Sequence, residues 1–87
     1  MNTKENIMKE VNIRLNTVND VKMFVSEVMK YNCNFDIISD RYIVDAKSIM
    51  GIFSLDLSKP LILRIDSEND REITEIEHGI FPFMAIK

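Results

Sequence analysis

The sequence predicts an α+β fold in which an antiparallel sheet carries helices on one face. Segments with alternating apolar and polar residues, typical of strands, occur between segments whose apolar residues recur every three or four positions, typical of helices. The resulting order is strand, helix, strand, strand, short helix, strand, helix. Two consecutive strands around a tight turn indicate a hairpin, and this mixture favours an antiparallel sheet with the helices packed on one side.

Composition narrows the function. The 87 residues are enough for one domain with a modest core. A formal net charge of −3 and a pI of about 5.0 argue against direct binding to nucleic acid, which normally needs a basic face. No apolar run approaches the roughly 20 residues of a membrane span, and the polar N-terminus lacks a signal-peptide core. The lone Cys33 has no neighbouring His or Cys at metal-ligand spacing. We therefore expect a cytoplasmic protein that holds no metal or cofactor.

The first half of the chain predicts one strand and one helix. Residues 1–8 are expected to be a disordered lead-in. An alternating segment follows and predicts a strand that ends near Asn16. Thr17 can then cap a helix, with Asp20 at the position of a capping-box acid. The apolar stripe of this helix comprises Val18, Val21, Phe24, Val25, Val28 and Met29.

The second half predicts a hairpin, a central strand and a last helix. Residues 35–38 and 42–45 form the hairpin around the turn at residues 39–41. The apolar residues 61–65 predict a central strand. A helix capped by Ser67 or Asn69 follows, and Gly79 is expected to end it. The apolar tail, residues 80–87, either folds back on the core, adds a short strand, or meets another subunit as a homodimer contact.

The segment 45–55 is the candidate functional stretch. Ser48 is a favoured N-cap residue for a short helix that contains Ile49, Met50, Ile52 and Phe53. One interpretation is a capped helix with an apolar face, in which Ser48 is never modified and the apolar residues pack in the core. At least one of Ile49, Met50 and Phe53 is then expected to be buried, and Ile52 is expected to be more buried than Met50. The other interpretation is a switch, because a phosphate on Ser48 would meet free backbone donors and the positive end of the helix dipole.

Together with the predicted order of elements, residues 46–55, Ala-Lys-Ser-Ile-Met-Gly-Ile-Phe-Ser-Leu, resemble HPr, the phosphocarrier of the bacterial sugar phosphotransferase system. The resemblance runs from about Val11 to Asp66 and is nearest to the Gram-positive members. It implies an open-faced β-sandwich, a four-stranded antiparallel sheet with three helices on one face in the order βαββαβα. It also implies a single domain over residues 1–87.

The same resemblance argues against a phosphocarrier role. HPr carries phosphate on a histidine at the start of its first helix, and Thr17 occupies that position here. Asn19 replaces the family arginine, which removes a charge-assisted donor to the phosphate oxygens, and Asp20 replaces a proline. Asp56 stands where the family has a glycine beside the active centre. The only histidine, His78, lies far along the chain in the last helix and is expected to interact with the helix dipole. We therefore expect no catalytic residue.

Ser48 matches a serine that a dedicated kinase/phosphorylase modifies in Gram-positive HPr, after which the protein acts as corepressor for a transcription factor of catabolite repression. Crh-like relatives lack the histidine and keep this serine, as this chain does. The resemblance thus implies a non-enzymatic regulatory protein with HPr kinase/phosphorylase and a transcriptional regulator as partners, and Ile49, Met50 and Phe53 as the contact patch. Two alternatives remain: a binding or assembly module without phosphorylation, and residual phosphotransfer through Thr17 or His78.

Overall fold

The computed structural model describes residues 6–85 and contains four strands and three α-helices. The strands are β1 (Ile7–Ile13), β2 (Asn34–Ser39), β3 (Tyr42–Asp45) and β4 (Leu61–Ser67). The helices are α1 (Val18–Val28), α2 (Ile49–Phe53) and α3 (Asp70–Ile80), followed by a short 3-10 helix, η1 (Phe81–Phe83). The predicted order βαββαβα is confirmed.

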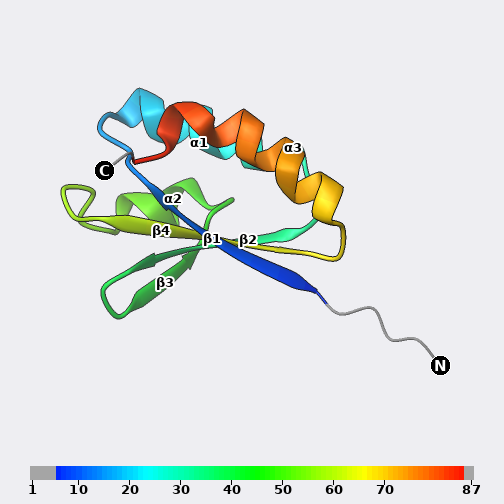
Figure 1. The fold of residues 1–87 in the computed structure, drawn as a ribbon. Coiled ribbons are helices and arrows are strands. Elements are labelled where there is room, and N and C mark those ends of the chain that lie inside the picture. Colours follow the sequence, from blue (N-terminus) through cyan, green and yellow to red (C-terminus); the bar gives the residue numbers. More distant parts are fainter. Residues whose placement is uncertain (1–5, 86–87) are drawn as a thin grey trace.

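All strand pairs are antiparallel, and the sheet order is β1-β4-β2-β3. β4 lies between β1 and β2, which confirms the prediction of a central strand. The helices cover one face of the sheet and leave the other face open, as Figure 1 shows for the pair α1 and α3. This arrangement is the predicted open-faced β-sandwich.

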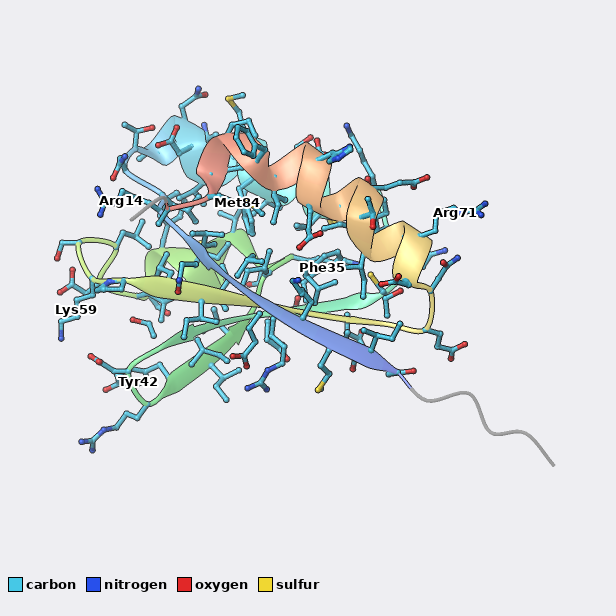
Figure 2. The ribbon with its side chains drawn as sticks, in the orientation of Figure 1. Arg14, Phe35, Tyr42, Lys59, Arg71 and Met84 are labelled. Atoms are coloured by element: carbon cyan, nitrogen blue, oxygen red, sulfur yellow. The ribbon has the colours of Figure 1, made fainter. Side chains whose placement is uncertain are left out.

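The core lies between the sheet and the helices because each strand alternates sides. In β4, Leu61, Leu63 and Ile65 are fully buried, while the residues between them are partly exposed. Phe35 of β2 lies between the sheet and the helices (Figure 2). The helices contribute the buried residues Val21, Phe24, Val25, Val28, Ile52, Ile73, Ile76 and Ile80. One cluster therefore unites the sheet with α1, α2 and α3.

β1 begins earlier than the sequence predicts. The expected lead-in over residues 1–8 is wrong for residues 7 and 8, which pair with Ser67 and Asp66 of β4; residues 1–5 lie outside the described residues. The strand also ends at Ile13 instead of near Asn16, although Leu15 is fully buried. Residues 7–10 are all exposed, so backbone pairing with β4 holds this part of the strand and burial contributes little.

The hairpin forms as predicted, with β3 over the expected residues 42–45. Its turn contains Asp40 in the left-handed region (φ 54°), a conformation that Asp tolerates better than most residues.

The helix predictions are confirmed with two corrections. Val18 and Met29, assigned to the buried stripe of α1, are 58% and 60% exposed because they lie at its two ends. Gly79 does not end α3, which continues to Ile80. Its role is different: a Cβ atom at Gly79 would collide with the Glu27 side chain of α1. The glycine therefore leaves room for the Glu27 side chain against α3.

The apolar tail folds back on the core over the described residues. Phe83 is buried, and its ring meets that of Phe24 edge-on at 5.6 Å between centroids. Met84 forms an isolated antiparallel bridge with Ile13 and lies beside the end of β1 (Figure 2). Of the three alternatives for residues 80–87, folding back thus applies together with a minimal strand contact, while residues 86 and 87 lie outside the described part of the chain.

Candidate functional site

Ser48 is the N-cap of α2. Its backbone is extended (φ −101°, ψ 107°), and its hydroxyl oxygen accepts the Gly51 N–H at 3.0 Å. This bond satisfies one of the free donors at the start of the helix. The Ser48 side chain is half-buried, and a Cβ at Gly51 would lie 3.2 Å from the Ser48 oxygen. Space at the cap is therefore tight on the side of Gly51.

The apolar residues of α2 divide into two groups. Ile52 is fully buried and fixes the helix on the core. Met50 is 78% exposed and Phe53 38% exposed, while Ile49 is half-buried against the core. The expectation that Ile52 is more buried than Met50 is confirmed. Two apolar side chains one turn apart thus remain available beside Ser48.

The adjacent cation, Lys47, is held elsewhere. Its ammonium group donates to the Tyr31 carbonyl at 2.7 Å and lies 5.6 Å from the centroid of the Phe35 ring. These contacts tie the start of α2 to the segment between α1 and β2. The hydrogen bond of the Ser48 hydroxyl is consequently made with the Gly51 N–H of α2 and not with Lys47.

Thr17 forms a complete capping box at the start of α1. Its hydroxyl accepts the Asp20 N–H at 3.0 Å, and the Asp20 carboxylate accepts the Thr17 N–H at 3.2 Å and the Asn16 N–H at 3.0 Å. The predicted roles of Thr17 and Asp20 are confirmed. Asn19 points along the helix, where its amide donates to the Met23 sulfur at 3.3 Å. All three side chains are accounted for by the helix start itself.

Asp56 lies in the exposed loop before β4. The Ser58 hydroxyl and backbone N–H donate to it at 2.6 and 3.1 Å, and these bonds lower the pKa of the Asp56 carboxyl. In the same loop, the Lys59 ammonium donates to the Asp40 carboxylate at 3.1 Å, and this hydrogen bond raises the pKa of the Lys59 ammonium. These contacts therefore hold the Asp56 carboxylate and the Lys59 ammonium in place at the surface of the loop.

The remaining candidates lie apart from α2. His78 is exposed in the last turn of α3, where a cation suits the helix dipole. Burial, followed by the negative charge of Glu72, raises the pKa of the Cys33 thiol, which makes the thiol a weaker nucleophile at neutral pH. Within residues 6–85, no group of three or more His, Cys, Asp or Glu side chains is placed to hold a metal ion. Nor is any helix there long and apolar enough to cross a membrane.

Sequence reasoning missed several exposed apolar residues on the helical side. Val18 and Met23 of α1 are each more than half exposed, as is Phe81 after α3. Helices α1 and α2 contact each other. The exposed apolar side chains of α1 and those of α2 are therefore carried by neighbouring helices. Helical periodicity places Met23 outside the apolar stripe of α1, so its exposure could have been predicted. It does not predict the exposure of Val18, because a residue at the end of a helix can lie beyond the sheet.

The four-stranded sheet with helices on one face defines a small open-faced β-sandwich. A family model described as "PTS HPr component phosphorylation site" matches residues 18–78. This chain belongs to the HPr family. A search of curated proteins found no match.

Solved structures agree with the family assignment. The crystal structure of HPr-C-His from Thermoanaerobacter tengcongensis is 27% identical with a TM-score of 0.62, over 85% of this chain and 91% of that chain. The phosphocarrier protein HPr from Bacillus anthracis str. Ames is 24% identical with a TM-score of 0.65, over 92% and 100%. A histidine-containing phosphocarrier protein from Mycoplasma has a TM-score of 0.64 at 18% identity, over 87% and 93%. The last two show the shared fold alone.

Proposed function

We propose that this chain is a cytoplasmic, non-catalytic regulatory member of the HPr family that has lost the phosphocarrier histidine. In this proposal a kinase of the HPr kinase/phosphorylase type modifies Ser48. The modified protein then acts in carbon catabolite regulation through contacts with a transcriptional regulator. The observation that carries the proposal is the position of Ser48 as the N-cap of α2. Its hydroxyl lies at the start of the helix, beside the exposed Met50 and Phe53.

The chemistry of the cap supports modification at Ser48. A phosphate group adds roughly −1.5 to −2 charges and three acceptor oxygens at neutral pH. At Ser48 these oxygens would meet the N–H of Gly51, which the hydroxyl already engages, and the positive end of the α2 dipole. Lys47 would have to leave the Tyr31 carbonyl to contribute. Modification therefore changes the charge next to Met50 without requiring α2 to unfold.

The start of α1 supports the loss of phosphotransfer. Thr17 stands where the resemblance to HPr requires the histidine, and its hydroxyl is engaged in the capping box. A phosphothreonine ester lacks the transfer potential of phosphohistidine. The family arginine is also replaced, by Asn19, so a phosphate there would lose its charge-assisted donor.

The apolar contact patch comprises Ile49, Met50 and Phe53. Met50 is exposed and unbranched, which suits an adaptable contact surface. Because Ile52 anchors α2 in the core, a partner can bind this patch without opening the fold. A partner that reads both Met50 and the charge on Ser48 would distinguish the two states of the protein.

Incubation with an HPr kinase and ATP tests the proposal. We expect intact-mass spectrometry to show a gain of one phosphate, which is lost in Ser48→Ala and kept in the matched variant Ser54→Ala at the other end of α2. An unchanged mass, or a phosphate that persists in Ser48→Ala, would refute the assignment of Ser48. In a separate reaction, Enzyme I and phosphoenolpyruvate should not label the chain. Labelling at Thr17 or His78 would instead support the alternative of residual phosphotransfer.

The second candidate is a binding or assembly module with no phosphorylation role. It invokes a homodimer through the tail, but Phe83 of the tail is buried against Phe24 and offers no free surface. Among the described residues of the tail, the exposed Phe81 is the one best suited to such a contact. Sedimentation of the unmodified chain decides this point, since a monomer at high micromolar concentration would leave the tail without an assembly role.

A further inference from the structure

The open face of the sheet carries two ordered rows of side chains. Strand register places three isoleucines in one row, because Ile62 of β4 lies opposite Ile38 of β2, and Ile38 lies opposite Ile43 of β3. These residues alternate with the buried core positions of their strands, so they point away from the helices. Ile43 is 59% exposed, and the other two are half-buried.

The neighbouring row is charged, and it lies two residues away from the isoleucine row on β4, β2 and β3. Glu10, Arg64, Asp36 and Asp45 lie opposite one another in turn across β1, β4, β2 and β3. Arg64 donates to Glu10 at 3.1 Å, which leaves the two aspartates of the hairpin directly opposite each other. Like charges at such a position destabilise a sheet pair.

A third carboxylate extends this negative surface. Asp66 follows Arg64 on the same face of β4, and its Oδ1 atom is shielded from solvent without a hydrogen-bond partner among the described residues. Asp36, Asp45 and Asp66 together line a hollow of about 270 Å³, whose lining also includes Lys47, the cation held by the Tyr31 carbonyl. None of the three takes part in an ion pair within residues 6–85.

The strands place four carboxylates and one guanidinium group on the open face, which is a formal charge of −3 from these residues. An exposed apolar row bordered by unneutralised charge is typical of an interaction surface and unusual for a face that only meets solvent.

We propose that the open face of the sheet docks a protein partner that presents an apolar ridge flanked by lysine or arginine side chains. The ridge covers Ile38, Ile43 and Ile62, and the basic groups neutralise Asp36, Asp45 and Asp66. A second copy of this chain does not fit, because two such faces would oppose like charges. The site lies on the side of the sheet without helices, so binding there leaves the Ser48 cap accessible.

NMR titration of the isotope-labelled full chain tests this assignment. The probe is an amidated amphipathic helix of leucine and lysine, and the control probe carries glutamate in place of lysine. We expect saturable shifts confined to the outer residues of β2, β3 and β4 with the lysine probe, and none with the glutamate probe. The double variant Asp36→Asn/Asp45→Asn should raise the dissociation constant roughly threefold to tenfold, as expected for two exposed charge pairs.

Matched variants separate this site from general attraction to an acidic protein. Asp70→Asn/Glu75→Gln removes the same charge from exposed positions of α3 and should leave the dissociation constant unchanged. Ile43→Thr should weaken binding, whereas Met23→Gln on α1 should not. Shifts on α1 or α2, equal weakening by both double variants, or no saturation would overturn the proposal. Open-face shifts that depend on protein concentration alone would assign the face to a second copy instead.

Discussion

Gly79 of α3 packs directly on the Glu27 side chain of α1, so closely that an added Cβ would lie 2.8 Å from the Glu27 carboxyl carbon. Glu27 is at the same time paired with Lys30 at 3.0 Å. The contact places a flexible acidic side chain against the backbone of a neighbouring helix. It explains a glycine in the last turn of α3, although alanine has the better helix propensity by up to about 1 kcal/mol.

We predict that Gly79→Ala leaves the free energy of unfolding within about 0.5 kcal/mol of the parent, because the gain in helix propensity is offset by displacement of Glu27 from Lys30. In the Glu27→Ala background the same change should stabilise by up to about 1 kcal/mol. Urea unfolding of the four members of this cycle measures the coupling. Additive effects would show that Glu27 does not restrict this position.

Thr17 should contribute to stability through its cap. Thr17→Ala removes the acceptor for the Asp20 N–H and is expected to lower the free energy of unfolding by about 1 kcal/mol. Thr17→Ser keeps the hydroxyl and should retain most of the stability. Thermal unfolding of the three proteins measures the difference. Equal loss in both variants would assign the effect to the Thr17 methyl group instead of the cap.

Residues of α2 should separate folding from recognition. Ile52→Ala creates a cavity at a fully buried position and should destabilise by about 2–5 kcal/mol. Met50→Ala changes a side chain that is 78% exposed and should alter stability by less than about 0.5 kcal/mol. Denaturant unfolding checks both values. A large loss in Met50→Ala would remove Met50 from the proposed contact patch and assign it a structural role.

Cys33 should react slowly in the folded protein. Since burial and then Glu72 raise the pKa of its thiol, the folded state disfavours the thiolate. The stability that this protonated thiol contributes is fully present below the unfolded thiol pKa of about 8.5 and is lost as the pH rises from there through the raised pKa of the folded protein. At pH near 8, iodoacetamide should modify Cys33 more slowly in buffer than in urea. Comparable rates in the two solvents would contradict the pKa shift.

Most of the fold could be predicted from the sequence because local signals and burial agree. The apolar β4 segment, the hairpin turn before β3, and the capping box at Thr17 and Asp20 are all predictable from local sequence. The start of β1 was not, since residues 7–10 are exposed on both sides and pair through the backbone alone. The contact of Gly79 with Glu27 could not be predicted either, because Glu27 belongs to a helix far away in the sequence.

The candidate site was only partly predictable for the same reason. Ser48 could be placed at a helix start from its own neighbours, but the capture of Lys47 by Tyr31 and Phe35 depends on packing between distant segments. The aspartate pair of the open face follows from strand register. Alternation within one strand predicts which face of the sheet a side chain points to. It does not predict which residue of the neighbouring strand lies opposite.

The central position of β4 also has a consequence for the order of folding. Both neighbours of β4 precede it in the chain, and its contact with β1 joins Glu10 to Arg64 across 54 positions. During synthesis, the β2–β3 hairpin and α1 can form early, but the sheet cannot close until β4 has left the ribosome. Closure of such long loops is the slow part of folding. The edge of β2 that pairs with β4 therefore stays unpaired in the nascent chain until late in translation. Chaperones have their main opportunity to bind it during this interval.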